Sequence, residues 1–169
     1  MLGIKIIIYS LIFLTSSGIG VIISKRYEQR AQELKDIKNA LNMFKTKIRF
    51  TYEPIPDIFK EISEKINSRT GKVFEIASCN MKLLTAGDAW NMAIDTNILE
   101  INEEDKRVLK DLSRLLGQTD IDGQINQIEL TNLFLDEQIK KAERDRDKNE
   151  KMYRILGMIA GLVIVIILI

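Results

Sequence analysis

The clearest helical pattern in this chain is LKDIKNALNMFKTKI at residues 34–48. Its apolar side chains recur at intervals of three and four residues, the spacing of a coiled-coil seam. They are Leu34, Ile37, Leu41, Phe44 and Ile48. This spacing predicts a long amphipathic helix. We expect it to end near Phe50, because Pro54 and Pro56 disfavour helical geometry in the residues that precede them.

Four shorter amphipathic helices are predicted beyond the two prolines. The second helix carries its apolar face between Ile55 and Ile66, and the third carries its face between Val73 and Leu84. The fourth is expected to start with Asp88 as its N-cap. The fifth opens at Asn102, with Leu115 and Leu116 facing inward, and ends where Gly117 adopts a left-handed cap.

The last helix is predicted to begin near Asp120 and to keep heptad spacing as far as Ala142, with Asn132 as a polar interruption. No helix-breaking residue separates it from the apolar carboxyl-terminal run. A loop is expected at residues 67–71, and alternation typical of strands is absent. The predicted fold class is therefore all-α: a six-helix antiparallel bundle between an N-terminal and a C-terminal transmembrane helix.

Both ends of the chain are uncharged and apolar, from Ile6 to Ile23 and from Ile155 to Ile169. As helices these runs would cover ~27 Å and ~22 Å, and the hydrocarbon core of a bilayer is ~30 Å thick. A cleaved signal peptide is the alternative for the first run, but no clear small-x-small cleavage site precedes Lys25. We therefore predict an anchor at residues 1–24, a bundle at 25–153 and a second anchor at 154–169.

Basic residues flank the inner ends of both runs, and the outer ends carry almost none. The inner basic residues are Lys25, Arg26, Arg30, Lys148, Lys151 and Arg154. By the positive-inside rule the middle of the chain lies in the cytoplasm and both termini lie outside. The runs also contain a GxxxG motif at residues 157–161 and a row of small residues around Gly20. These predict close packing through Gly20, Gly157 and Gly161, unless they are ordinary membrane-helix glycines.

Composition excludes several kinds of chemistry. The 169 residues contain no histidine and one cysteine, and the formal net charge is +1. His-dependent catalysis, a zinc cluster, a disulfide and general attraction to nucleic acid are therefore not expected. The glycine of Asp120–Gly123 stands at the wrong position for a calcium loop, and Gly71-Lys72 lacks the rest of a phosphate-binding loop. We predict no enzyme activity and no cofactor, with Cys79 and Trp90 in the core.

The motifs together resemble the stage III sporulation protein AB family of endospore-forming bacteria, over nearly the whole chain. The most specific are Leu116-Gly117-Gln118-Thr119-Asp120 with Gly123-Gln124, and Lys151-Met152 with Leu156-Gly157. Others are Arg30, Leu34, Ala40-Leu41, Tyr52, Pro54-Ile55, Ala89-Trp90 and Ala93. The chain departs from the family pattern at Glu53-Pro54-Ile55 and at Met43-Phe44-Lys45.

The resemblance implies a place in a secretion-like channel complex between mother cell and forespore. It also implies a soluble domain similar to the cytoplasmic domain of inner-membrane platform proteins of type II secretion and type IV pilus systems. That domain is a six-helix bundle and faces a secretion-type ATPase, so the expected partners are such an ATPase and other membrane components of the complex. The alternative is a membrane-tethered sensor or scaffold unrelated to transport.

The turn before the last helix is the candidate contact surface for the ATPase. Capping explains Gly117 and Asp120 but does not require Gln118, Asp122 or Gln124. By helix rise the turn would lie ~40 Å from the lipid. We therefore nominate Gln118, Asp122 and Gln124 as contacts, with Glu53 beside them. The alternative is that they form an ordinary solvated corner between two helices.

Overall fold

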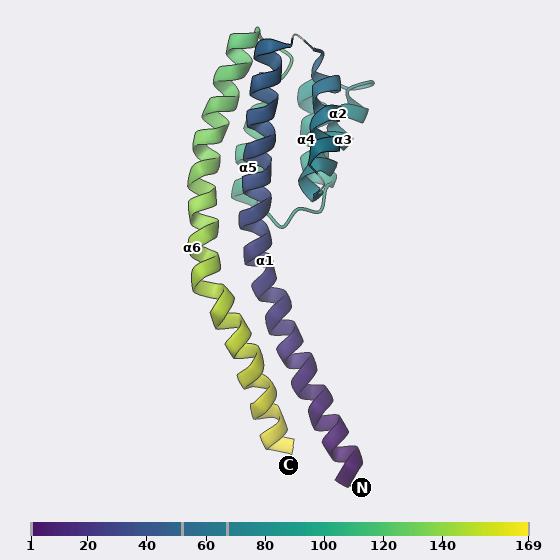
Figure 1. Ribbon diagram of the computed structural model, residues 1–169, viewed down its shortest axis with the longest axis vertical. Coiled ribbons are helices and arrows are strands. Elements are labelled where there is room, and N and C mark those ends of the chain that lie inside the picture. The colour runs from purple at the N-terminus through teal and green to yellow at the C-terminus, as the bar shows by residue number, and fades with distance from the viewer. Residues whose placement is uncertain (1, 52, 67, 169) are drawn as a thin grey trace. The chain divides into compact units, whose positions relative to one another are not determined.

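The chain is helical throughout most of its described part (Figure 1). The computed structural model describes residues 2–51, 53–66 and 68–168, and it describes side chains from Ile7 onward. Tyr52 in the predicted turn, Asn67 in the predicted loop and Ile169 at the end of the second apolar run lie outside the described residues. No strand occurs in the described ranges. The predicted all-α class with six helices is confirmed.

Six α helices and one short 3-10 helix follow one another along the chain. They are α1 (Leu2–Phe50), α2 (Ile55–Lys65), α3 (Arg69–Asn80), α4 (Ala86–Thr96), α5 (Glu103–Asp111), η1 (Leu112–Arg114) and α6 (Ile121–Leu168). They form two compact units. Unit 1 comprises residues 1–31 and 141–169, and unit 2 comprises residues 32–140.

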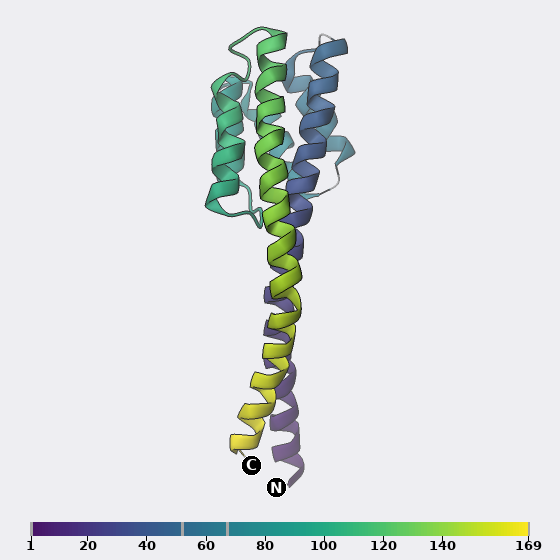
Figure 2. The same cartoon turned by 90° about the vertical axis from the view of Figure 1, so that its left-hand side faces the viewer.

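Unit 1 consists of the first part of α1 and the last part of α6, which run side by side (Figure 1, Figure 2). Each contains a segment long and apolar enough to cross a membrane, and few of the residues in those segments are buried. Large side chains such as Leu11, Leu14 and Ile166 are exposed. A helix that is apolar on every exposed side suits a lipid environment better than water.

Unit 2 is built around an aromatic cluster contributed by four helices. Phe59 lies at its centre, with ring centroids 4.9 Å from Phe44, 5.0 Å from Phe74 and 5.8 Å from Trp90. All four rings are fully buried. The Trp90 indole N–H donates to the Leu109 carbonyl oxygen at 2.7 Å, so the one polar atom of the cluster is satisfied.

The seam predicted from residues 34–48 packs as expected. Each of its five apolar side chains is buried, and the α6 side chains Ile125, Ile128, Leu135 and Ile139 are buried as well. The polar interruption Asn132 donates from its Nδ2 to the Asn42 Oδ1 at 3.0 Å. In unit 2, α1 and α6 therefore meet along an apolar seam that includes this hydrogen bond between two amide side chains.

Three predicted boundaries were wrong in detail. The N-cap of α4 is Thr85, whose Oγ1 accepts from the Asp88 N–H, so Asp88 lies inside the first turn. Helix α3 ends at Asn80, which leaves Leu84 exposed in the following turn. Helix α5 ends at Asp111 and η1 tightens the chain toward Gly117, which turns Leu115 outward.

The α2–α3 connection is shorter than predicted, and Cys79 is not in the core. Gly71 is inside α3, where a Cβ atom would come within 1.9 Å of the Ile66 carbonyl oxygen, so only glycine fits this close approach. Cys79 is exposed. In α3 the buried residues are Thr70, Gly71, Val73, Phe74 and Ala77, and the 100° step per residue turns position 79 away from their face.

Candidate functional site

The turn between η1 and α6 is built by its own polar atoms. Gly117 has a φ of 72°, the left-handed geometry predicted for it. Asp120 caps α6, since its Oδ1 accepts from the Gly123 N–H at 2.9 Å. A Cβ atom on Gly123 would come within 2.4 Å of the Thr119 Oγ1, so a side chain there would displace Thr119. Backbone geometry, helix capping and close packing therefore account for Gly117, Asp120 and Gly123 of the turn motif, respectively.

Gln124, nominated from sequence as a contact, is part of this turn. Its Oε1 accepts from the Gly117 N–H at 3.3 Å, and its Nε2 donates to the Thr119 carbonyl oxygen at 3.2 Å. The side chain thus spans the corner and satisfies two backbone groups. Residue spacing does not reveal this role, because it depends on the three-dimensional path of the turn.

The other nominated residues are differently placed. Gln118 and Asp122 are both exposed, and within the described part of the chain neither side chain makes a hydrogen bond or ion pair. Glu53 lies in the α1–α2 connection, with an Oε1 3.6 Å from the Lys47 Nζ. The chain approaches the turn just after that connection, at the first residue of α2, Ile55, whose Cδ1 is 3.6 Å from where a Gly117 Cβ would lie. The turn therefore presents Gln118 and Asp122 to solvent, with the Glu53 segment near.

The small residues of unit 1 bring α1 and α6 into backbone contact. A Cβ atom on Gly157 would come within 2.9 Å of the Gly20 Cα and 3.0 Å of the Ser16 carbonyl oxygen. The Ser16 hydroxyl donates to the Gly157 carbonyl oxygen at 2.9 Å. On Gly161 a Cβ atom would meet Phe13 and Ser16 at 3.1–3.2 Å. The three nominated glycines thus line one helix–helix interface.

An ion pair between a buried carboxylate and a partly exposed arginine, which the sequence did not reveal, ties three segments of unit 2 together. The Glu33 carboxylate on α1 accepts from the Glu100 N–H at 2.6 Å and lies 3.0 Å from the Arg69 Nε. The Glu33 side chain is only 8% exposed. Burial raises the pKa of this carboxyl above its ordinary value, although the hydrogen bond from Glu100 and the charge of Arg69 counteract part of that rise. Arg69 also donates to the Ile98 carbonyl oxygen at 3.3 Å, so the pair holds the α4–α5 loop.

Glu33 could have been noticed because it directly precedes the first seam residue. A charged residue at the edge of an apolar stripe points partly toward the core and needs a partner there. Its partners are 36 and 67 residues away along the chain, so no local pattern identifies them.

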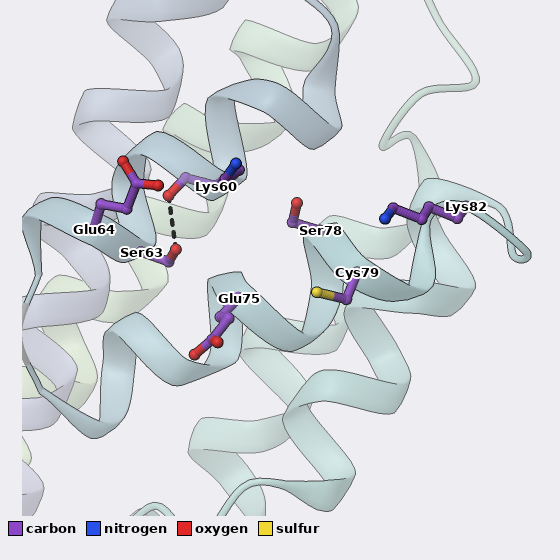
Figure 3. A pocket seen from close by; sticks show the side chains of 7 residues that line it. All are labelled: Lys60, Ser63, Glu64, Glu75, Ser78, Cys79 and Lys82. Carbon is purple, nitrogen blue, oxygen red and sulfur yellow. Dashed lines mark hydrogen bonds between the residues drawn. The ribbon is translucent and has the colours of Figure 1, made fainter.

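A groove of about 480 Å³ lies between α2 and α3 (Figure 3). It is lined by Lys60, Ser63, Glu64, Glu75, Ser78, Cys79 and Lys82. Its two hydroxyls are used by the helices, since Ser63 donates to the Lys60 carbonyl oxygen and Ser78 to the Pro56 carbonyl oxygen. Neither hydroxyl donates to a base, which a nucleophile would need. Among the described side chains no group of three metal-ligating residues comes together.

Comparisons with known proteins agree with this architecture. The family model described as stage III sporulation protein AB matches residues 5–169. The curated stage III sporulation protein AB of Bacillus subtilis (strain 168) is 24% identical over 161 residues, which are 93% of this chain and 94% of that protein.

A solved structure of stage III sporulation protein AB superposes with a TM-score of 0.65 at 21% identity. The match covers 71% of this chain and 98% of the solved one, which shows a shared fold. Because the family model covers almost the full length, the chain belongs to the stage III sporulation protein AB family.

Proposed function

We propose that the chain is a non-enzymatic platform component of a secretion-like channel complex between mother cell and forespore. In this role it couples a cytoplasmic secretion-type ATPase to the membrane part of the complex. Family membership supports the coarser statement that the protein acts in sporulation. The coupling role is the finer proposal, and it rests on the resemblance to type II secretion platform proteins.

The observation that carries the proposal is the continuity of the two long helices. Helix α1 is a single helix from Leu2 to Phe50, and α6 is a single helix from Ile121 to Leu168. Each contains an apolar segment in unit 1 and contributes a buried seam to unit 2. In this proposal the two continuous helices are the physical route by which ATPase binding at unit 2 reaches unit 1.

The topology in this proposal follows the basic residues at the inner ends of the apolar segments. Residues 25–154 face the cytoplasm and both termini lie outside, in the mother-cell membrane around the forespore. The anchors then comprise residues 1–24 and 154–169, and the domain between them is available to a cytoplasmic ATPase.

The proposed contact surface on unit 2 is the η1–α6 turn. Gln118 and Asp122 are its contact residues and Glu53 flanks them, since all three carry polar groups that solvent or a partner can reach. Gln124 supports the surface from within the turn through its two backbone hydrogen bonds. An exposed charge at an interface rim acts mainly on partner choice and association rate.

Affinity purification of the full chain from membranes of sporulating cells tests the proposal. Mass spectrometry should find a secretion-type ATPase with the wild-type chain and with Glu75→Lys, a matched charge reversal on the exposed face of α3. Asp122→Lys should reduce ATPase recovery while Trp90 fluorescence shows that unit 2 stays folded. A wild-type chain that never recovers an ATPase contradicts the coupling role. Equal recovery with Asp122→Lys places the contact elsewhere.

A further inference from the structure

Unit 1 carries four exposed basic side chains at a similar height along its two helices. Gly20 of α1 lies against Gly157 of α6, which sets the helix register, and Tyr27 stacks on Tyr153 with ring centroids 5.8 Å apart. Lys25 and Arg26 precede Tyr27, and Lys151 and Arg154 flank Tyr153. At 1.5 Å per residue the four cations fall within ~6 Å along the helix axes. We call these four residues the basic collar.

The collar cations are free within the described part of the chain. All four side chains are exposed, and none has an ion pair or hydrogen bond to another described residue. The neighbouring charges behave differently: Arg30 is paired with Asp145 at 3.0 Å, and Arg146 is paired with Asp147 at 2.8 Å. Arg30 and Arg146 thus have acidic partners, whereas the four collar cations have none in the described part of the chain.

Two carboxylates lie at the same level, on Glu28 and Glu150. The collar therefore keeps a net positive charge. It also lies directly beside the apolar segments, since a Cβ atom on Gly20 would come within 2.6 Å of the Tyr153 carbonyl oxygen. Paired tyrosines next to an apolar segment are typical of the headgroup level of a bilayer.

We infer that the basic collar is a binding site for anionic phospholipid headgroups, which it holds by their phosphates around the α1–α6 pair. Arginine offers a planar fork to a phosphate and lysine offers a point charge, so the collar combines both modes. A headgroup bound there would bridge the two helices on the side where they leave the apolar segments. This inference rests on the membrane-spanning part of the proposed function, and it does not depend on the ATPase.

Lipid selectivity measured on the full chain in bilayers tests the inference. The protein is reconstituted into phosphatidylcholine with a trace of spin-labelled phosphatidylglycerol or spin-labelled phosphatidylcholine, and the protein-associated fraction of each is compared. Since one cation near the surface changes the preference about five-fold, the wild type should favour phosphatidylglycerol by at least about that factor. Raising the salt to ~1 M should weaken the preference, because the Debye length then falls to ~3 Å.

The deciding variant combines Lys25→Gln, Arg26→Gln, Lys151→Gln and Arg154→Gln. Its preference for phosphatidylglycerol should fall to about that of a neutral lipid. The control combines Arg49→Gln, Lys60→Gln, Lys72→Gln and Lys82→Gln, which removes the same charge from exposed positions of unit 2 and should leave the preference unchanged.

Each result supports or overturns the site. Wild-type protein that does not float with phosphatidylcholine vesicles contradicts the membrane-spanning part of the proposed function. Protein that floats but shows no preference, or an equal loss in the control variant, overturns the collar alone. Inorganic phosphate at constant ionic strength should leave the preference intact. If it abolishes the preference, the collar is a site for free anions and the lipid assignment is wrong.

Discussion

Gly20 of α1 lies directly against Gly157 of α6, so that a Cβ atom on Gly20 would come within 3.0 Å of the Gly157 Cα. Lipid supplies no hydrophobic driving force between two apolar helices, and their contact therefore depends on close backbone approach and on hydrogen bonds. Both are present here, because the Ser16 hydroxyl bonds across the same interface. The two apolar segments thus form an intrachain pair.

This pairing predicts that two cysteines introduced across the interface, one on each helix, will form a disulfide within one chain. The Ser16 Cβ lies 3.2 Å from where a Gly161 Cβ would stand, close to the ~3.8 Å of natural disulfides. In a Cys79→Ser background, Ser16→Cys with Gly161→Cys should oxidise within one chain, as followed by free-thiol loss and mass. Gly18→Cys with Gly161→Cys should not, because nothing lies within 4 Å of a Cβ at Gly18.

Adding Gly157→Leu to the Ser16/Gly161 cysteine pair should sharply lower the disulfide yield, since the new side chain would displace α1. The matched change Gly18→Leu points into open space and should leave the yield as it was. Undiminished yield with Gly157→Leu would mean that the helices pack through another face.

Phe59→Ala should destabilise unit 2 by roughly 3–5 kcal/mol, because it removes the central ring of the aromatic cluster and leaves a cavity. Urea unfolding of the full chain followed by Trp90 fluorescence measures this directly, as Trp90 is the one tryptophan. Phe50→Ala is the control: that ring is 71% exposed and its loss should matter little. Similar losses from both variants would contradict the assigned core.

Gln124→Ala should cost about 1 kcal/mol, because it leaves two backbone groups of the turn without their protein partner. Gln118→Ala should cost almost nothing, since its side chain is exposed. The same urea titration separates the two. A larger loss from Gln118→Ala would reverse their assigned roles.

Stability should depend on pH through Glu33. Burial raises the pKa of this carboxyl above its ordinary value, so the folded chain holds the proton more tightly than the unfolded chain. The resulting stabilisation is fully present below the unfolded pKa and is lost as pH rises through the folded pKa. Glu33→Gln should therefore reduce the fall in urea midpoint between about pH 4.5 and neutral pH.

Glu61 gives the opposite sign and serves as the comparison. The hydrogen bond from Lys47 lowers the pKa of this carboxyl, so its stabilisation is present above the unfolded pKa and is lost as pH falls. Glu61→Gln should make the midpoint less sensitive to acid. If Glu33→Gln and Glu61→Gln shifted the pH dependence in the same direction, the burial of Glu33 would be misassigned.

Periodicity predicted the seam from Leu34 to Ile48, and residue type predicted the caps at Gly117 and Asp120, because both depend on neighbouring residues. The prediction that Cys79 lies in the core was wrong. It relied on residue type, whereas the helical spacing of α3 turns this residue outward. The Glu33–Arg69 pair and the role of Gln124 depend on segments that meet only in the folded chain. Local spacing carries no information about them.

Topology is the claim on which the proposed coupling most depends, and the exposed Cys79 of unit 2 reports it directly. A membrane-impermeant thiol reagent is applied to intact and to permeabilised cells carrying the full chain, with Cys79→Ser as the background. Leu168→Cys in that background marks the outer side. We predict labelling of Cys79 only after permeabilisation and labelling of Leu168→Cys in intact cells. Labelling of Cys79 in intact cells would place unit 2 outside the cytoplasm and contradict its contact with a cytoplasmic ATPase.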